Sequence, residues 1–332
     1  MSEADLPPKL DDVAAKAGVS TATVSRFFNN PNVVAPATAE RIRTAVEATG
    51  YIPNLMAGGL ASAKSRLVAV LIPHIAESIF GDMIERMVEE LTASGITVML
   101  GVTGTQAHRT EELIRAAMSR RADAIISTGP VDDKIRALVQ RSKIIFIQVW
   151  ELPADPIDIA VGFSHRDAGR DIARFLISRG YRRPHLVTSD AGRLKARSDA
   201  FRTEWSAQAG STPTESVVDM PSRYGHARRV FAEIKRLSDP PDVVVCGSDH
   251  LAQGLIIEAQ ASGFRVPDQL GIVGFGNASI AGEMRPTITT VDIDGSRIAR
   301  EAIAALARPR AERSEAERRI DVGFRLIARE SA

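Results

Sequence analysis

The sequence of 332 residues predicts an α/β protein in which a small all-α domain precedes two doubly wound parallel-sheet subdomains. Residues 1–50 carry helical patterns and no apolar strand-like run. From Arg66 onward, continuous apolar runs alternate with amphipathic helical patterns. That alternation is typical of parallel sheets covered by helices on both faces, and the number of runs fits two sheets better than one.

The segment from Leu10 to Arg26 predicts two short helices that meet at a glycine turn. Gly18 suits the left-handed backbone of such a turn, and Ser20 is the expected N-cap of the second helix. A short, mostly polar second helix is typical of a helix-turn-helix that enters a DNA major groove. A pair of short helices joined by glycine is also common elsewhere, so this pattern alone leaves both interpretations open. A third helix is expected over 36–49, with Gly50 ending it.

Apolar runs in the remainder of the chain predict its strands. They lie at 67–72, 97–100, 124–127, 144–149, 159–161, 185–187, 243–246, 271–273 and 289–291. Helical patterns lie between them, at 80–93, 111–119, 167–178, 198–209, 226–237 and 252–262. Open parallel sheets bind ligands at the carboxyl ends of their strands, so two facing sheets predict a small-molecule cleft at their junction.

Composition and motifs narrow the function classes. No apolar run is long enough to span a membrane, and the acidic N-terminus is unlike a signal peptide, so we expect a cytoplasmic protein. A single cysteine, Cys246, excludes an intramolecular disulfide. The histidines lack metal-ligand spacing, and neither a nucleophile elbow nor a phosphate-binding loop is present. We therefore expect no metal, no cofactor and no enzymatic activity. The net charge of +1 neither requires nor excludes DNA as a partner.

Several short motifs resemble the lactose-repressor (LacI) family of bacterial transcription regulators. They are Asp12-Val-Ala, Ala17-Gly-Val-Ser20, Thr23-Val-Ser-Arg26, Gly50-Tyr51, Pro53-Asn54, Ala168-Gly169, Ser248-Asp249, Val266-Pro267 and Gly274-Phe275. The segments 159–163 and 321–325 are most similar to the gluconate-repressor branch. The resemblance implies a repressor, with a body like a periplasmic binding protein, that a small-molecule effector releases from a palindromic operator.

The resemblance also implies the domain boundaries. It places a helix-turn-helix domain at 1–50, a hinge helix and linker at 51–65, and an effector-binding and dimerisation domain at 66–332. Within the last, one subdomain is expected at about 66–158 and 292–319 and the other at about 159–290 and 320–332. We place the three crossings between them near Ile159, Thr290 and Ile320.

The predicted DNA contacts come from the second helix and the hinge. They are Ser20, Thr21, Ala22, Thr23, Ser25, Arg26, Asn29, Asn54 and Leu60. By resemblance Leu60 inserts into a base step, which kinks the duplex. Gly58 and Gly59 depart from the family pattern, and each lowers helix propensity by about 1 kcal/mol relative to alanine. We therefore expect an unusually unstable hinge helix that is ordered only by contacts with DNA and with the partner.

The predicted effector contacts lie at strand ends. They are Phe80, Trp150, His165, Arg197, Ser248, Asp249 and Asn277. Asp249 could equally be a helix N-cap from the residues alone, and Trp150 could stack on a sugar or be a surface or interface tryptophan. The resemblance implies ligand contacts for Asp249 and Arg197. Many relatives carry Asp-Asn where this chain has Ser164-His165, so a possible imidazolium there favours an anionic effector such as a sugar acid.

The chain end bears on assembly, and the body alone leaves other functions open. The charged run 308–319 is expected to be a solvated loop or helix. No C-terminal leucine heptad follows it, so a homodimer is expected rather than a tetramer. A transport-type sugar-binding protein without a DNA role is the alternative, and an enzyme built on two parallel sheets is a third interpretation. The expected partners are double-stranded operator DNA, the effector and a second copy, with no membrane.

Overall fold

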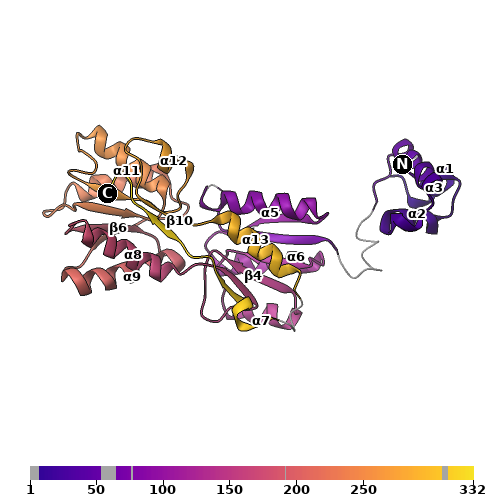
Figure 1. Ribbon diagram of the computed structural model, residues 1–332, viewed down its shortest axis with the longest axis horizontal. Helices are drawn as coiled ribbons and strands as arrows, with labels where there is room; N and C mark the ends of the chain where they lie inside the picture. Colours follow the sequence, from indigo (N-terminus) through magenta and orange to yellow (C-terminus); the bar gives the residue numbers. More distant parts are fainter. Residues whose placement is uncertain (1–6, 54–64, 76–77, 191, 309–312) are drawn as a thin grey trace. The chain divides into compact units, whose positions relative to one another are not determined.

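The computed structural model describes residues 7–53, 65–75, 78–190, 192–308 and 313–332. The chain divides into two compact units, Met1–Ser65 and Arg66–Ala332, which are called here the head and the body. Figure 1 shows the head in indigo and the body in the colours that follow. No helix among the described residues is long and apolar enough to cross a membrane.

The head consists of helices at the predicted positions. They are α1 (Leu10–Ala17), α2 (Thr21–Asn29), a 3-10 turn (Pro31–Val33) and α3 (Pro36–Thr49). Helix α2 presents one fully buried residue, Val24, to the other two helices. The rest of the buried core comes from α1 and α3, where Val13, Ala14, Ala17, Ile42 and Ala45 pack together. Small residues at the crossing allow the helices to approach closely, as their spacing in the sequence predicts.

The turn between α1 and α2 is fixed from both sides. Gly18 has φ 64°, a left-handed conformation that glycine adopts without strain. The Ser20 hydroxyl accepts a hydrogen bond from the Thr23 backbone nitrogen at 3.2 Å and so caps α2. From α3, the Arg41 guanidinium donates to the carbonyl oxygens of Ala17 and Gly18, which are free at the end of α1. The orientation of α2 therefore depends on all three helices.

The first subdomain of the body contains a six-stranded parallel sheet. Its strands are β1 (Leu67–Ile72), β2 (Thr97–Val102), β3 (Ala124–Ser127), β4 (Ile145–Val149), β5 (Ile159–Gly162) and β11 (Arg319–Asp321), in the order β11-β5-β4-β3-β1-β2. Helices α5 (Gly81–Ala93) and α13 (Gly295–Leu306) cover one face, and α6 (Ala107–Ser119) and α7 (Asp133–Ser142) cover the other (Figure 1). Because both faces are buried, the strand Leu67–Ile72 is apolar throughout.

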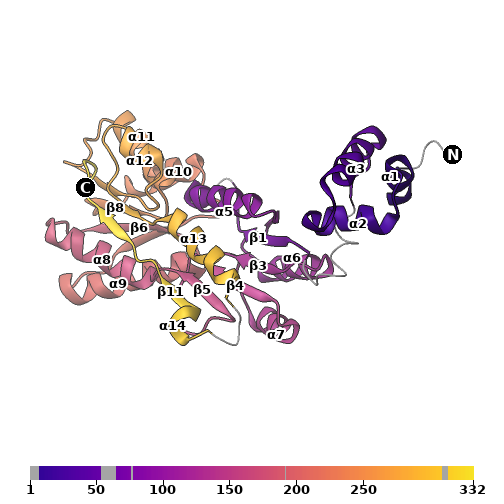
Figure 2. The ribbon, with the colours of Figure 1, turned by 45° about the vertical axis from the view of Figure 1, so that its right-hand side comes forward.

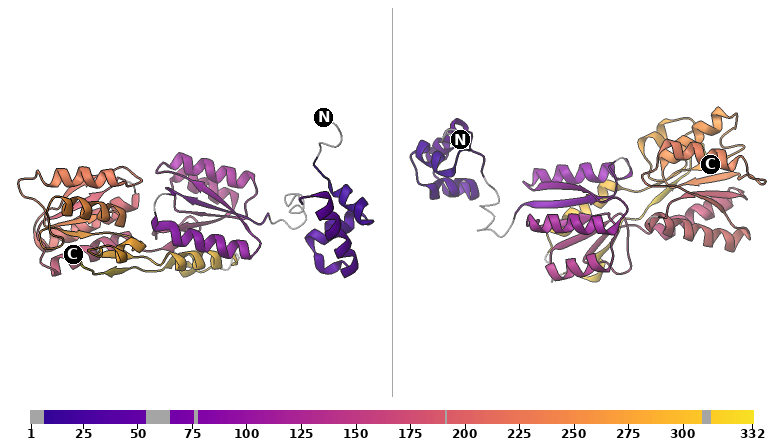
Figure 3. Two further views of the ribbon diagram at one scale, coloured as in Figure 1. Left: turned by 90° about the horizontal axis from the view of Figure 1, so that it is seen from above. Right: turned by 180° about the vertical axis from the view of Figure 1, so that it is seen from behind.

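The second subdomain contains a four-stranded parallel sheet. Its strands are β6 (Pro184–Thr188), β7 (Thr214–Val217), β8 (Val243–Cys246) and β9 (Gly271–Val273), in the order β7-β6-β8-β9. Helices α8 (His165–Ser178) and α9 (Gly192–Ala209) cover one face, and α10 (Tyr224–Ile234) and α11 (Asp249–Ala261) cover the other (Figure 2). A short helix, α12 (Ser279–Glu283), follows β9. The two sheets lie side by side within the body, each with its own helices (Figure 3).

Helices α8 and α9 pack unusually closely at one point. Gly169 lies against the backbone of α9, and a Cβ atom added there would overlap the carbonyl oxygen of Arg197 and lie 3.1 Å from the backbone nitrogen of Phe201. Only glycine can occupy this position without moving the helices apart. The Ala168-Gly169 pair of the sequence motif therefore allows α8 to pack directly against the backbone of α9 at Arg197.

The chain passes between the subdomains three times. It leaves the six-stranded sheet after β5 and again after β11, and it returns through β10 (Thr290–Asp292), which pairs with the antiparallel β12 (Arg325–Ile327). The predicted boundaries at 158/159 and 319/320 therefore fall a few residues too early, because β5 and β11 both belong to the first sheet. An apolar pattern identifies a strand but not the sheet that it joins.

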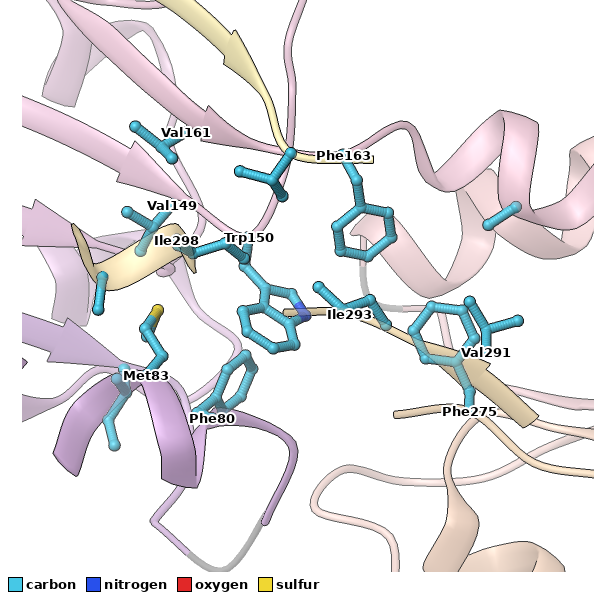
Figure 4. Close-up of a cluster of buried hydrophobic side chains, with 14 of the residues drawn as sticks. Phe80, Met83, Val149, Trp150, Val161, Phe163, Phe275, Val291, Ile293 and Ile298 are labelled. Atoms are coloured by element: carbon cyan, nitrogen blue, oxygen red, sulfur yellow. The ribbon is translucent and has the colours of Figure 1, made fainter. Parts of the chain in front are cut away.

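A continuous apolar cluster crosses the junction between the subdomains. In Figure 4, Trp150 lies beside Phe80 at the end of the first sheet, and Phe275 lies near Val291 on the opposite side. The rings of Trp150 and Phe80 are 5.1 Å apart and meet edge to face. Phe163 is 6.2 Å from both Trp150 and Phe275, so it bridges the two sides.

The charged run near the end of the chain is partly buried, which corrects its prediction as a solvated segment. It contains a short helix, α14 (Glu315–Arg318), and residues 309–312 lie outside the described part. Arg313 forms an ion pair with Asp158 at 3.1 Å, and each side chain is only 2% exposed. Arg318 donates to the carbonyl oxygens of Asp158 and Pro156. The segment before β11 is therefore held by these contacts against the loop that precedes β5.

Candidate functional site

A cleft lies in the body, at the carboxyl ends of strands from both sheets. Its deeper part, called here the inner lobe, is lined by aromatic, cationic and acidic groups from both subdomains. Among them are Phe80, Trp150, His165, Arg193, Arg197, Asp249 and Phe275. The empty space, counting solvent at its mouth, is about 780 Å3, which suits a small-molecule site. The structure thus brings together six of the seven predicted effector residues and places one of them, Asn277, elsewhere.

Arg197 supplies a buried positive charge to the inner lobe. Its guanidinium lies over the Phe275 ring, 3.4 Å from the ring centre, and donates to the carbonyl oxygen of Gly247 at 3.0 Å. The residue is only 7% exposed. Burial, together with the nearby charge of Arg193, lowers the pKa of Arg197 from its usual range. A charge held under these conditions favours an anion as its partner.

Arg193 is the second cation of the cleft and was not among the predicted residues. Its guanidinium lies over the Phe80 ring, 5.1 Å from the ring centre, and donates to the Thr128 carbonyl oxygen at 3.4 Å. Arg193 precedes Arg197 by one helical turn at the start of α9. The spacing of four residues from the predicted Arg197 is the one signal in the sequence that could have identified Arg193. It becomes informative only when α9 is known to begin at the cleft.

His165 lines the inner lobe as predicted, but the suggested imidazolium is wrong. Its Nε2 atom bonds the carbonyl oxygen of Trp150 at 3.0 Å, and the ring is 6% exposed. Burial and the charges of Arg197 and Arg193 lower the pKa of His165 well below its usual value. The ring is therefore neutral, and since a carbonyl oxygen only accepts, Nε2 carries the proton. The positive charge of the cleft comes from the two arginines instead.

Asp249 is buried at the floor of the inner lobe, where it is 1% exposed. Its carboxylate accepts hydrogen bonds from the Thr290 hydroxyl at 2.6 Å and the Ala278 backbone nitrogen at 2.8 Å. Burial raises the pKa of Asp249, while these hydrogen bonds oppose the rise. The alternative N-cap role falls instead to Ser248, whose hydroxyl accepts from the Leu251 nitrogen at 3.4 Å. Ser248 also shares a hydrogen bond with Ser222 across the lobe.

The two remaining aromatic candidates form a wall of the lobe. Trp150 is 2% exposed and Phe80 1%, so the alternative of a surface tryptophan is wrong. Trp150 follows β4 with φ 75°, a left-handed conformation that is uncommon for a bulky residue. Packing against Phe80 and the hydrogen bond from His165 to its carbonyl oxygen hold it there.

Asn277 does not line the inner lobe. Its side-chain amide donates to Asp292 at 3.0 Å, and its amide oxygen accepts from Arg329 at 2.8 Å. Both partners belong to the segments that cross between the subdomains. Its position after β9 resembled that of the other candidates, but it lies in the loop between β9 and α12, where its backbone is left-handed, with φ 50°.

A second part of the cleft, called here the outer lobe, adjoins the inner one. The lobes share Arg193, Leu194 and Met220. The outer lobe is further lined by residues that follow strands of the first sheet, namely His74, Thr105, Thr128 and Glu151. None of these four was predicted, because they lie in loops where no periodic pattern marks them.

The predicted DNA-contacting residues of α2 lie mostly on the exposed side of the head. Thr21, Ala22 and Arg26 are exposed, whereas Thr23 and Ser25 are half-buried. Asn29 is exposed, and its side-chain nitrogen donates to the Ser25 carbonyl oxygen at 2.9 Å. Ser20 and Thr23 share a hydrogen bond between their hydroxyls. The two hinge candidates Asn54 and Leu60, together with Gly58 and Gly59, lie outside the described residues.

Comparisons with known proteins agree with this arrangement. Residues 9–54 match the model of bacterial regulatory proteins of the lacI family, and residues 173–332 match that of the periplasmic binding protein-like domain. The HTH-type transcriptional regulator GntR of Escherichia coli (strain K12) is 30% identical over 326 residues, which cover 96% of this chain and 97% of the relative. The GntR regulator of Pseudomonas aeruginosa is also 30% identical, over 98% of this chain and 95% of its own. The chain belongs to the LacI family.

Solved structures of LacI-family regulators show the same fold. A LacI-family transcriptional regulator from Silicibacter pomeroyi superposes with a TM-score of 0.89 at 27% identity, covering 98% of this chain and 99% of its own. The transcription regulator GntR from Chromobacterium violaceum has a TM-score of 0.74 at 29% identity, over 80% of this chain and 98% of its own. This LacI-family chain is thus a transcriptional regulator with a DNA-binding head and an effector-binding body, and the relatives named above are regulators rather than enzymes.

Proposed function

We propose that this regulator is a cytoplasmic, non-enzymatic repressor that leaves a pseudo-palindromic operator when a sugar acid binds its cleft. The observation that carries the proposal is Arg197, whose buried guanidinium lines the inner lobe under the influence of a second positive charge, that of Arg193. An anionic effector would balance this charge. The resemblance of segments 159–163 and 321–325 to the gluconate-repressor branch supports a gluconate-like compound.

Two hydrogen bonds connect the cleft to the junction between the subdomains of the body. Asp249 bonds Thr290 of β10, and His165 of α8 bonds Trp150 at the end of β4. Both bonds join an inner-lobe residue to a segment at the junction of the subdomains. An effector that changes either contact would bias the relation between the subdomains, and by linkage operator DNA would then weaken effector binding to the same degree.

Fluorescence anisotropy with labelled DNA from upstream of the protein's own gene tests this proposal. The titration is run at fixed salt, with and without gluconate, related sugar acids and neutral sugars. We expect specific binding that a sugar acid abolishes. Arg197→Met should keep the DNA affinity and lose the response to the acid, whereas Arg26→Ala should lose roughly tenfold in DNA affinity and keep acid binding.

The matched control for Arg197 is Arg202→Met on the same helix, because Arg202 pairs with Asp199 outside the cleft. It should leave both activities unchanged. Release by neutral sugars and not by acids would reject the sugar-acid part of the proposal. Acid binding without any specific DNA binding would instead support the transport-type interpretation.

We propose a homodimer because a pseudo-palindrome presents two equivalent half-sites. Exposed apolar side chains on the first subdomain supply a surface that a second copy could cover: Ile75 is 68% exposed, Val88 on α5 40% and Leu100 on the edge strand β2 45%. Light scattering should give twice the chain mass. Leu100→Asp with Val88→Asp should give the monomer mass, and a dimer that survives both changes would place the interface elsewhere.

A further inference from the structure

Among the residues that the structure describes, several polar groups of the outer lobe have no hydrogen-bond partner. The Nε2 atom of His74 and the hydroxyl of Thr128 are both buried without a hydrogen bond, and Thr128 is 7% exposed. Within the described part of the chain, the carboxyl group of Glu151 forms neither a hydrogen bond nor an ion pair; burial raises its pKa, and the charge of Arg193 opposes the rise. Unmet polar groups of this kind cost free energy until a ligand or water reaches them, so their convergence in one lobe indicates a binding surface.

The position of Glu151 is fixed by the strands around it. Trp150 and Glu151 follow β4 directly, and the first lines the inner lobe while the second lines the outer lobe. A Cβ atom added at Gly162 of β5 would lie 2.6 Å from the backbone nitrogen of Glu151, so the backbone there rests against the neighbouring strand. Glu151 is therefore held at the branch of the cleft by the sheet itself.

The two lobes differ in charge. The inner lobe holds Arg197 and Asp249, the outer lobe holds Glu151, and Arg193 lies at their boundary. Burial and the charge of Arg193 also lower the pKa of His74, which keeps its imidazole neutral. Beyond Arg193, the outer lobe thus offers a carboxyl group, a neutral ring and hydroxyls, which suit the hydroxyl groups of a polyol chain.

We propose that the cleft reads the effector at both ends: Arg197 and Arg193 hold its carboxylate, and Glu151 with Thr128 binds the hydroxyl-bearing end and rejects a second anion there. This inference rests on the proposed function and deepens it. The effector is then a polyhydroxy acid with one anionic group. A diacid or phosphorylated acid of the same chain length would place its second charge beside Glu151.

Isothermal titration calorimetry on the full-length protein tests the inference. The probes are gluconate, glucarate, 6-phosphogluconate and the neutral polyol glucitol. For the wild type we expect gluconate to bind at least about tenfold more tightly than either doubly anionic compound, because like charges repel in a partly buried site. Glu151→Gln, which keeps the shape and removes the charge, should reduce this ratio to about threefold or less. Thr128→Val should weaken gluconate several-fold without changing the ratio.

The control is Asp155→Asn, which removes a negative charge four residues away on an exposed side chain that pairs with Arg136. It should leave the ratio at its wild-type value. Equal wild-type affinities for gluconate and glucarate, or a ratio that Glu151→Gln does not change, would overturn the inference. If only glucitol binds, the sugar-acid proposal fails, but the glucitol affinities of the variants still test whether the outer lobe binds hydroxyl groups. Weaker glucitol binding in both Glu151→Gln and Thr128→Val would support its role, and unchanged binding would reject it. Binding of none of the four compounds would reject both proposals.

Discussion

The head and the body bury very different amounts of apolar surface. In the described head, Val13, Val24 and Ile42 are the only fully buried apolar side chains larger than alanine. The body holds three clusters around its sheets, with large buried rings such as Trp150, Phe146 and Trp205. Since apolar burial supplies about 25 cal/mol per Å2, the head rests on a few contacts and the body on many.

This difference predicts which single substitutions will unfold a unit of the protein. A small core depends on each of its members, whereas a large one tolerates the same loss without unfolding. The two units can also be followed separately, because both tryptophans, Trp150 and Trp205, lie in the body. Tryptophan fluorescence therefore reports the unfolding of the body. A change in the helical circular dichroism signal that is not accompanied by a change in fluorescence reports the unfolding of the head.

The largest expected effect is in the body, at the ion pair of Asp158 and Arg313. Asp158→Asn leaves Arg313 buried and unpaired, which should lower the free energy of unfolding by about 3–5 kcal/mol. Urea unfolding followed by tryptophan fluorescence measures it, and Asp155→Asn, on an exposed side chain, should change it by less than about 1 kcal/mol. Similar losses for the two variants would mean that the buried pair has no special weight. We expect the body of Asp158→Asn still to fold at room temperature, because its large apolar clusters continue to stabilise it.

The second effect is of similar size but falls on the head. Ile42→Ala removes a side chain that is 0% exposed at the centre of the small core, which should cost about 2–5 kcal/mol. We expect the head to unfold, with loss of helical signal and of DNA binding, while the fluorescence transition and effector binding stay unchanged. A head that remains folded and binds DNA would break the contrast between the two cores.

A pH dependence of intermediate size is expected in the body. His185 bonds Thr214 at 2.8 Å and Ser216 at 3.0 Å, and burial lowers its pKa from 6.5 to about 4. The folded body thus disfavours the protonated ring. Its contribution to stability is complete above pH 6.5 and is lost as the pH falls towards 4.

Between about pH 7.5 and pH 5, this loss should amount to about 2 kcal/mol of unfolding free energy. His185→Gln should reduce the slope measured by urea unfolding, while His165, whose pKa is lowered in the same direction, keeps part of it. His108→Gln, at an exposed position on α6, is the control. Identical slopes in the wild type and in His185→Gln would exclude His185 as the cause.

The smallest effect is expected at the start of α2. Ser20→Ala removes the cap on the Thr23 nitrogen and should destabilise the head by about 1 kcal/mol. The melting of the helical signal measures it, and Thr44→Ala, at an exposed position inside α3, should be nearly neutral. If the two variants melt alike, the cap does not contribute to the stability of this head.

Much of the fold was predictable because its strands are buried on both faces. The strand at 67–72 and the strand at 243–246 were predicted at their observed bounds, since each is an uninterrupted apolar run. Strands β7, β11 and β12 were missed, because they are short and none of their residues is fully buried, so no apolar run marks them. Pairing, rather than composition, makes them strands.

The site was predictable where a motif ends a strand, as at Asp249. It was not predictable where burial changes the chemistry of a group. The sequence places a histidine at 165, but only the structure shows that its Nε2 atom bonds the Trp150 carbonyl oxygen and that burial and the charges of Arg197 and Arg193 lower its pKa. Likewise, Glu151 and Thr128 gain their importance from lining the same lobe of the cleft, which no spacing along the chain expresses.

The tight fit at Gly169 has a consequence for anyone who redesigns this protein as a biosensor. Because the backbone of α9 lies against α8 there, any larger side chain at 169 would move the helix that carries Arg193 and Arg197. New ligand preferences are then better obtained by exchanging side chains on α9 than by shifting the backbone of this helix. A library that varies the two arginine positions and leaves 169 untouched would explore chemistry without disturbing the scaffold.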